Sequence, residues 1–281
     1  MKKIILLDNL EQLNFTLEFT DAYLIGIKDM CVNTTFSVDL NELKSISNKL
    51  KKGNKELFIL LNKNLHNSDI ETLKEILINL NKLDIKGIFY SDVAVIQIKE
   101  ELNLNYDLVW AAEHATTNYN TINYWYNFGA KYTFISSDIT YDNIIEIKNN
   151  TKSKLIVPVF GYLPMFVSRR HIVKNYLDYF KLNDNSKINY IEKENKIYPI
   201  VDNKLGTFVY SNNILNGVNY YKNLEKENID YALFNGFNIN TEGLIEVLKI
   251  YSGKSNKNIN SLFENLDEGF LNKETIYRVK K

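Results

Sequence analysis

The segment VPVFGYLPMFVSRRHIVKNYL, residues 157–177, concentrates residue types that can bind an anion or transfer a proton. The chain contains only three arginines, three prolines and three histidines, and Arg169, Arg170 and His171 follow one another here. A guanidinium holds a phosphate or a carboxylate through two parallel hydrogen bonds, which a lysine ammonium cannot do. Because a composition rich in asparagine, isoleucine and lysine favours lysine wherever arginine is optional, we predict that Arg169 and Arg170 bind an anionic substrate.

Gly161 precedes the two arginines and would let the backbone turn tightly or approach that ligand closely. The alternative interpretation places both arginines in solvent on a helix, with Met165, Phe166 and Val167 in the core. The scarcity of arginine favours the functional interpretation for at least one of the pair.

A second polar cluster lies in WAAEHATTNYNTINYW, residues 110–125. Glu113 and His114 end an apolar run, and a carboxylate beside an imidazole can perform acid–base chemistry or accept a hydrogen bond from a substrate. Adjacent strand residues point to opposite faces, so these two need not share one site. The candidate catalytic residues are therefore Glu113, Asp138 and His171, and the candidate substrate-binding residues are Arg169, Arg170, Asn118 and Gly161.

Eight short apolar runs, alternating with amphipathic stretches, would have to position these residues. Each run is almost continuously apolar, which is typical of a strand buried on both faces. Eight strand–helix units in 281 residues predict an α/β fold, a (β/α)8 barrel of the TIM type, with a doubly wound open sheet as the alternative. The expected strands span residues 3–8, 22–27, 56–62, 87–92, 107–112, 132–137, 154–161 and 231–236.

Amphipathic stretches at residues 39–52, 68–83 and 241–251 predict helices between these strands. Ser68 and Glu71 have the spacing of a capping box, and Asn240 is a plausible cap for the last helix.

The eighth strand comes late in the chain, so residues 162–230 are expected to form an insertion between strands 7 and 8. The insertion should contain a helical part and a hairpin in KINYIEKENKIYPIV. We expect one barrel domain over residues 1–252, including the insertion, and a C-terminal tail, residues 253–281, that wraps the outside of the barrel.

Functional groups in such a barrel gather at the C-terminal ends of the strands. Asp8, Asp92 and Asn235 lie at such ends, but Asp and Asn also cap helices and start loops, and this structural interpretation is favoured for the three. Other polar residues at strand ends are Asn62 with His66, Glu113 with His114, and Asp138.

The composition excludes several classes of protein. The single cysteine, Cys31, excludes an intramolecular disulfide and any zinc or iron–sulfur site built mainly from the thiolates of this chain. Three scattered histidines match no metal-binding spacing, so no metal site is expected. Equal numbers of basic and acidic residues, 34 each, give no overall field to attract nucleic acid. No apolar run reaches the roughly 20 residues of a membrane span, and we expect a cytoplasmic protein.

Three stretches resemble the U32 peptidase family, the collagenase-like proteases, over nearly the whole chain. VFGYLPMFVSRRHIVKNYL resembles the family signature, which runs roughly Gly-x-x-Cys-Met-x-x-Ser-x-x-Cys. EHATTNYNTINYWYNFGAKYTFISSDITYDNIIEI and YPIVDNKLGTFVYSNNIL resemble the segments on either side, and the ending DEGFLNKETIYRVKK resembles the close of the short Firmicutes members.

The resemblance implies a barrel-like domain but several activities. Members have been called proteases, and others act in hydroxylation of tRNA at the wobble uridine, of ribosomal RNA or of ubiquinone. Several members carry an iron–sulfur cluster on four cysteines. In this chain, Pro164 and His171 occupy the positions where the family motif has cysteines. The iron–sulfur cluster is therefore expected to be absent, and no other cofactor is expected.

The short Firmicutes members are linked to 5-hydroxyuridine formation in tRNA together with a longer, cysteine-bearing paralogue. The resemblance therefore implies a tRNA-hydroxylation component with such a paralogue as partner, and tRNA or a small carboxylate co-substrate as ligand. Two alternatives stay open. One is a peptidase, although no nucleophile–base pair is visible in the sequence. The other is a non-catalytic scaffold for the cluster-bearing partner.

Overall fold

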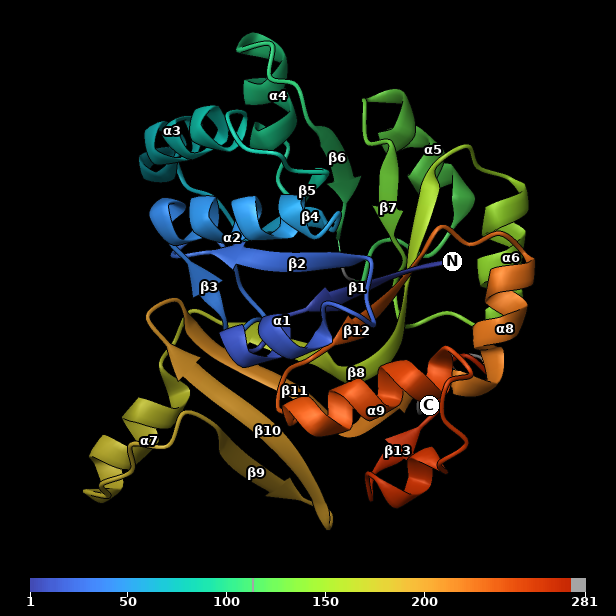
Figure 1. The fold of residues 1–281 in the computed structure, drawn as a ribbon. Helices are drawn as coiled ribbons and strands as arrows, with labels where there is room; N and C mark the ends of the chain where they lie inside the picture. The colour runs from blue at the N-terminus through green and yellow to red at the C-terminus, as the bar shows by residue number, and fades with distance from the viewer. Residues whose placement is uncertain (113, 274–281) are drawn as a thin grey trace, which may run out of the picture.

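The computed structural model describes residues 1–112 and 114–273, and its central feature is a closed barrel of eight parallel strands (Figure 1). Neighbouring strands pair in parallel around the whole ring, and β12 pairs with both β1 and β8, which closes it. The predicted (β/α)8 barrel is confirmed, and the open sheet is excluded. The barrel strands are β1 (Lys2–Leu6), β2 (Ala22–Ile27), β4 (Glu56–Leu61), β5 (Gly87–Tyr90), β6 (Asp107–Trp110), β7 (Tyr132–Phe134), β8 (Lys154–Ser168) and β12 (Tyr231–Asn235).

A helix follows each barrel strand, and the apolar stripes of these helices pack on the outside of the ring. Asp39 caps α2 in a capping box with Glu42, and Asn240 caps α9 through the Gly243 N–H, as the sequence predicted for Asn240. The barrel helices are α1 (Leu10–Thr16), α2 (Leu40–Lys52), α3 (Ile70–Leu80), α4 (Ala94–Glu101), α5 (Tyr119–Asn127), α6 (Tyr141–Asn149), α8 (Val218–Lys226) and α9 (Thr241–Tyr251).

The predicted capping box of Ser68 and Glu71 is wrong. Residues Asn67–Asp69 form a short 3-10 turn, η1, ahead of α3, and the Asp69 carboxylate accepts the His66 N–H at 2.9 Å. The helix begins at Ile70, one residue later than the motif implied, and the Asp69 carboxylate bonds back to His66 and does not cap α3. Across residues 1–112 and 114–273, no helix has the length and apolar character that a membrane crossing requires.

The lower half of the barrel interior is filled by an aromatic cluster centred on Phe58, which is fully buried. Its ring meets Phe89, Tyr132 and Tyr231 edge-on, with centroids 5.6 to 6.1 Å apart. The Tyr231 hydroxyl donates to Glu56 at 2.8 Å at the N-terminal end of the strands. Aromatic packing thus closes this end, and the opposite end is left for a site.

Of the insertion predicted over residues 162–230, residues 162–216 form an arm built on the extension of β8 beyond the barrel (Figure 1), whereas the rest contains the barrel helix α8. Strand β8 runs 15 residues and pairs antiparallel with β11 (Gly206–Asn216), which continues to β10 (Lys196–Asn203) and β9 (Asn189–Lys193). The predicted hairpin is β9–β10, and the helical part is α7 (Ile172–Phe180). The expectation that Gly161 ends the seventh strand is wrong, because Gly161 lies inside β8.

Gly161 marks the point where β8 leaves the barrel. Its φ is +112°, and a β-carbon there would overlap the backbone carbonyl oxygen of Asn235 on β12. Only glycine accepts this backbone conformation so close to a neighbouring strand. The residue therefore shapes the junction between barrel and arm.

The arm is fixed to the barrel mouth by a small apolar cluster. Tyr210 of β11 stacks on Phe237, which follows β12, with centroids 3.8 Å apart and planes at 17°. Val201 and Phe208 complete the buried part of this cluster. Farther along β8, Met165, Phe166 and Val167 are 43 to 54% exposed, so the interpretation that placed these three in the core is wrong.

The described part of the C-terminal tail, residues 253–273, returns to the barrel and arm. Its short strand β13 (Leu266–Asp267) pairs with β11, and the Leu271 carbonyl accepts the Tyr141 N–H at 3.0 Å. A second 3-10 turn, η2 (Ile259–Ser261), lies before β13, and β3 (Ser37–Val38) pairs with β2. The division into a barrel domain over residues 1–252 and a tail stays a prediction.

Candidate functional site

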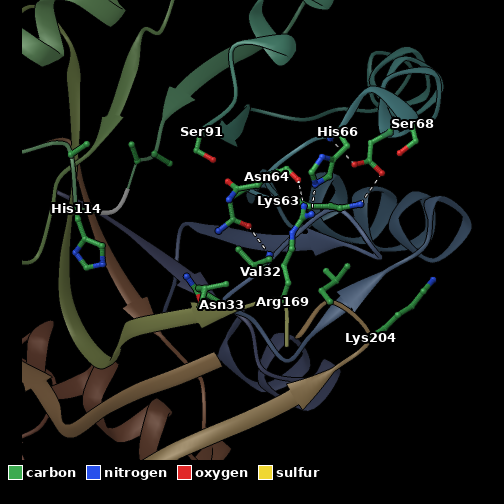
Figure 2. Close-up of a pocket in the computed structure, with 17 residues that line it drawn as sticks. Val32, Asn33, Lys63, Asn64, His66, Ser68, Ser91, His114, Arg169 and Lys204 are labelled. Carbon is green, nitrogen blue, oxygen red and sulfur yellow. Dashed lines mark hydrogen bonds and ion pairs between the residues drawn. The ribbon is translucent and has the colours of Figure 1, made fainter. Parts of the chain in front are cut away.

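A cavity of about 700 Å³ lies between the C-terminal mouth of the barrel and the arm (Figure 2). We call it the vestibule. The loops after β2, β4, β5 and β6 form one side, and the ends of β8 and the β10–β11 turn form the other. Its lining residues are Val32, Asn33, Asn62, Lys63, Asn64, His66, Ser68, Asp69, Ser91, Ala111, Ala112, His114, Ala115, Val167, Arg169, Lys204 and Leu205.

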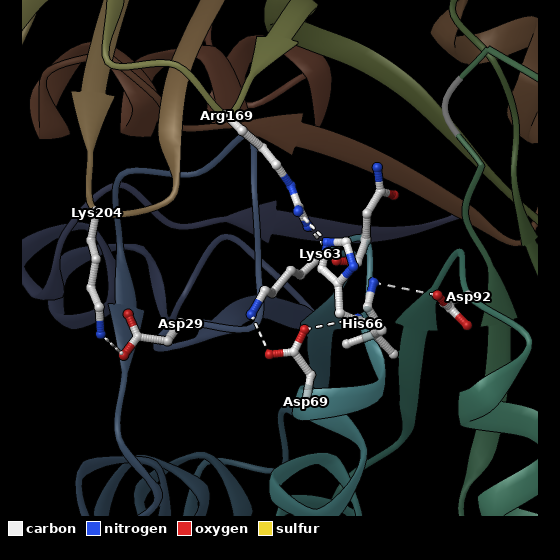
Figure 3. Close-up of polar contacts among 9 residues, drawn as sticks. Asp29, Lys63, His66, Asp69, Asp92, Arg169 and Lys204 are labelled. Atoms are coloured by element: carbon white, nitrogen blue, oxygen red, sulfur yellow. Dashed lines mark hydrogen bonds and ion pairs between the residues drawn. The ribbon is translucent and has the colours of Figure 1, made fainter.

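Arg169 crosses from the arm to the loop after β4 (Figure 3). One guanidinium nitrogen contacts His66 Nε2, and the other donates to the Asn64 carbonyl oxygen at 3.0 Å. A guanidinium has only donors, so His66 Nε2 is the acceptor in this contact. The pairing of β8 with β11 sets the position of Arg169, since Gly206 lies so close to Ser168 that no side chain fits there.

Two lysines on the vestibule wall are held by carboxylates. Lys63 pairs with Asp69 at 2.9 Å, and Lys204 of the arm pairs with Asp29 of the barrel at 2.7 Å. The His66 N–H and the Lys63 ammonium hold the pKa of the Asp69 carboxyl below its ordinary value, so Asp69 stays ionised and keeps Lys63 in place. The Lys204–Asp29 pair and the Arg169–His66 contact both tie the arm to the mouth.

A smaller, apolar cavity of about 70 Å³ lies in the barrel mouth beneath the vestibule, and we call it the well. Val32, Asn33, Asn62, Ala111 and His114 line both cavities. The remaining wall of the well consists of Leu6, Leu24, Leu60, Phe89, Phe134, Ser137, Pro158, Phe160, Tyr162, Leu163, Pro164, Leu233 and Asn235.

His114 and Asp138 form an ion pair or hydrogen bond at the rim, with Nδ1 and Oδ2 2.8 Å apart. The two residues come from the loops after β6 and β7. A carboxylate on Nδ1 fixes the neutral imidazole as the tautomer with a proton on Nδ1, so Nε2 is left as a proton acceptor. This pair is the arrangement that general acid–base chemistry requires.

The amino-acid sequence matches the description "Peptidase family U32" over residues 8–277. This match covers far more than half of the chain. The chain belongs to peptidase family U32. The resemblance predicted from the motifs is therefore confirmed.

The chain is similar in sequence to the tRNA hydroxylation protein P2 of Bacillus subtilis (strain 168). It is 30% identical over 240 residues, which cover 82% of this chain and 76% of the relative.

Solved structures share the fold at much lower identity. The U32 peptidase Mk0906 matches with a TM-score of 0.54 and 12% identity, covering 84% of this chain and 92% of that one. A mutant tryptophan synthase alpha-subunit from Pyrococcus furiosus matches with a TM-score of 0.51 and 13% identity, covering 90% and 98%. At these identities the matches bear on the fold alone, and the barrel agrees with them.

The iron–sulfur cluster of several U32 members does not fit this chain. One cysteine cannot supply four thiolates, and Pro164 lies in the wall of the well, where it offers no ligand. His171 donates from Nδ1 to the Asp202 carboxylate at 2.8 Å on the arm, outside the vestibule. Among the residues that the structure describes, no three His, Cys, Asp or Glu side chains gather as a metal site.

Cys31 is expected to resist alkylation in the folded protein. The side chain is 4% exposed, its Sγ contacts the Ile27 carbonyl oxygen at 3.2 Å, and burial, with a smaller contribution from the Asp29 charge, raises the pKa of the thiol to about 12. The thiolate is the reactive form, so iodoacetamide at pH 8 should label the urea-unfolded chain but leave the native chain unlabelled over the same interval. Equal labelling rates measured by mass spectrometry would contradict the burial.

The structure separates the residues that the sequence grouped around residue 169. Arg169 lines the vestibule, whereas Arg170 does not, and its backbone N–H is bonded to Ser168. His171 is bonded to Asp202, which also accepts the Lys174 N–H at the start of α7. These contacts order the turn that presents Arg169.

The other predicted site residues have separate places. Asn118 caps α5 by accepting the Thr121 N–H at 2.9 Å, and Gly161 shapes the base of the arm. Asp138 lies at the mouth beside His114, and its catalytic role stays a prediction. Glu113 lies outside the described residues, so its candidate role stays a prediction.

Asp8, Asp92 and Asn235 have the structural roles that the sequence favoured. Asp8 accepts the Asn238 N–H and the Thr35 hydroxyl, and burial raises the pKa of its carboxyl. Asp92 accepts the Ala94 N–H at 2.9 Å, and Asn235 donates to the Tyr162 carbonyl oxygen at 2.7 Å. The three side chains hold loops at the mouth.

Sequence reasoning did not bring Lys63, Lys204 and Asn33 into the site. Two lysines among 31 carry no individual signal, and Lys204 is 141 positions from Lys63 in the chain. Asn33 is 6% exposed and has a φ of +58°, which asparagine tolerates better than most residues. The only feature of the sequence that could have identified Asn33 is its position after β2, at the end of the barrel where functional residues gather.

Proposed function

We propose that this chain takes part in tRNA hydroxylation, as a component that forms 5-hydroxyuridine at the wobble position. The observation that carries the proposal is the 30% identity to a tRNA hydroxylation protein over 82% of the chain. The vestibule supports it, because Arg169 offers a guanidinium to an anion at the barrel mouth, and His114 offers an oriented imidazole on the same cavity. The anion would be a tRNA phosphate or a small carboxylate co-substrate. Such a role places the protein in the cytoplasm.

The test is nucleoside mass spectrometry of total tRNA from the source organism with and without this gene. We expect 5-hydroxyuridine and its derivatives to disappear on deletion and to return when the gene is supplied on a plasmid. An unchanged profile, in a strain that makes the modification, would refute the proposal.

We further propose that a longer, cysteine-bearing U32 paralogue is the partner. This chain cannot supply a thiolate cluster, so redox chemistry of that kind would come from another subunit. The arm supports a docking role, because many of its apolar side chains are exposed. Exposed members are Met165, Phe166, Val167, Ile172, Tyr176, Tyr179, Phe180, Leu182, Tyr190, Ile191 and Ile197. A concentration of exposed apolar side chains favours a protein–protein contact.

Co-expression with the paralogue tests the partner. Phe166→Asp is expected to abolish co-elution on size-exclusion chromatography, because Phe166 is 49% exposed on the arm. Phe128→Asp is the matched control, since Phe128 is 50% exposed at the end of α5 on the barrel. Co-elution that survives Phe166→Asp, or that both variants abolish, would contradict docking through the arm. If the chain is a scaffold without chemistry of its own, binding of the partner should require the arm, and tRNA hydroxylation should not require Arg169.

A peptidase is the second candidate, and the His114–Asp138 pair favours it, since hydrolases use an imidazole oriented by a carboxylate. Cys31 is buried and cannot serve as the nucleophile of that imidazole. Cleavage of gelatin by the purified chain, lost in His114→Ala, would establish this candidate.

A further inference from the structure

The vestibule and the well are adjacent and differ in chemical character. Five residues line both cavities, so the two share a wall at the barrel mouth. The vestibule wall carries Lys63, His66, Arg169 and Lys204, whereas the well is walled mainly by leucine, phenylalanine and proline side chains. A ligand that fills both must have a compact, largely apolar part and an anionic part.

Arg169 is the cation of the vestibule whose charge is available to that ligand. Lys63 and Lys204 are neutralised by Asp69 and Asp29. Within residues 1–112 and 114–273, the Arg169 guanidinium has no carboxylate within ion-pair distance, and its partners are the His66 imidazole and the Asn64 carbonyl oxygen. Three of its five N–H donors therefore remain for an incoming anion, and a phosphate oxygen pair matches their geometry.

The floor shared by the two cavities carries a donor for a carbonyl group. Asn62 Oδ1 accepts the Val32 N–H at 2.8 Å, which fixes the amide so that Nδ2 is the end left over. The side chain makes no other hydrogen bond among the described residues. A carbonyl oxygen on the edge of a flat ring would accept from Nδ2, while the faces of the ring meet Leu24, Leu60 and Phe89.

His114 lines three cavities at the barrel mouth. Besides the vestibule and the well, it borders a third space of about 320 Å³, bounded also by Asp138 and Pro164. Figure 2 shows His114 across the vestibule from Arg169. Asp138 fixes Nδ1, so Nε2 is the nitrogen that can accept a proton from a ring held in the well.

We propose that the barrel mouth binds one unstacked pyrimidine nucleotide, with the ring in the well and a phosphate on Arg169. Asn62 Nδ2 donates to a ring carbonyl oxygen, and His114 Nε2 lies at the ring edge as proton acceptor. The proposal rests on the function proposed above and names its substrate group. A nucleotide of RNA reaches such a pocket only when it leaves its stack, and a single-stranded loop makes this easiest. Because the well is small, about 70 Å³, we assign it to a single pyrimidine ring and not to a fused purine.

The test is ligand-observed NMR titration of the purified chain with UMP, uridine and AMP. The free energy of a hydrogen bond between charged groups corresponds to roughly a tenfold to hundredfold difference in affinity. UMP, which carries the phosphate, should therefore bind more tightly than uridine by that factor. AMP should bind more weakly than UMP, and saturation transfer should be strongest at the pyrimidine H5 and H6 protons. Equal affinities for UMP and uridine, or for UMP and AMP, would overturn the proposal.

Variants assign the two halves of the site. Arg169→Ala should reduce UMP affinity to that of uridine, whereas Arg170→Ala, one position away and outside the vestibule, should leave UMP affinity unchanged. Ala111→Leu should fill the well and abolish binding of both ligands. Where that variant unfolds, Asn62→Asp keeps the acceptor for the Val32 N–H and removes the ring donor, so uridine affinity should fall roughly tenfold. Equal effects of the two arginine variants, or no effect of the well variants, would overturn the proposal.

The titration tests the nucleotide site, and the tRNA analysis tests the proposed function, so each proposal can be refuted without the other. Hydroxylated nucleosides that depend on the gene, without UMP binding, would refute the nucleotide site and leave the proposed function intact. UMP binding through Arg169, with an unchanged nucleoside profile, would refute the proposed function and leave the site.

Discussion

Arg169→Ala is expected to lower 5-hydroxyuridine formation by roughly tenfold to a hundredfold, while Arg170→Ala leaves it unchanged. A hydrogen bond to a charged group contributes about 1.5–3 kcal/mol, which is the size of that loss. Arg169 reaches the vestibule from the arm and has no carboxylate partner among residues 1–112 and 114–273. Arg170 carries the same side chain but does not line the cavity. Comparing the two variants therefore distinguishes the effect of the position of Arg169 from the effect of losing one positive charge.

The measurement is quantitative nucleoside mass spectrometry of tRNA from a deletion strain that carries each variant on a plasmid. Arg169→Lys should recover part of the activity, because lysine keeps the charge but lacks the paired donors. Matched protein levels and unchanged thermal unfolding would exclude a folding defect. Full activity of Arg169→Ala would refute the role of Arg169 and favour the scaffold interpretation.

Gly161→Ala is expected to lower the free energy of unfolding by at least about 3 kcal/mol. Backbone strain at a φ of +112° costs about 1–3 kcal/mol, and the added β-carbon would overlap the Asn235 backbone and lie 2.7 Å from the Asn235 β-carbon. Strand β8 or β12 must then move at the barrel seam, and the Asn235–Tyr162 hydrogen bond is lost with it. Thermal unfolding should shift down by roughly 6–12 °C, at about 2–4 °C per kcal/mol.

Gly129→Ala is the matched control for this substitution. Its φ is +92°, but a β-carbon there would meet nothing within 4 Å. It should cost only the strain of a left-handed alanine, about 1–2 kcal/mol. Equal destabilisation by the two variants, measured by urea unfolding, would show that the contact with Asn235 is unimportant and that backbone strain alone matters.

The sequence predicted the barrel well because its strands have a local signature. A strand that is buried on both faces must be almost continuously apolar, and runs such as ELFILL and YALFN show this without reference to any partner. Asn240 was identified as a cap for the same reason, since the Asn240 side chain bonds an N–H three residues away. The cap of α3 was predicted wrongly, because the capping box forms earlier, between His66 and Asp69 at the start of η1.

The site was predicted only in part, since its residues meet through long-range packing. The unusual composition around residue 169 pointed to the segment that carries Arg169, which lines the vestibule. It also suggested Arg170, which lies in the same bend after β8 but does not line the vestibule. The exposure of Phe166 had no local signal either, because an apolar residue on an arm looks like one in a core.

The amino-acid sequence by itself determined the family, the eight-stranded barrel, the insertion and the lack of thiols for a cluster. These features depend on residue identity and short-range periodicity. The tertiary structure alone decided that the arm folds back over the mouth, that Arg169 meets His66 across 103 positions, and that His114 pairs with Asp138. Such contacts depend on the register of β8 with β11 and on the closure of the barrel, which bring distant residues together through the summed packing of many side chains.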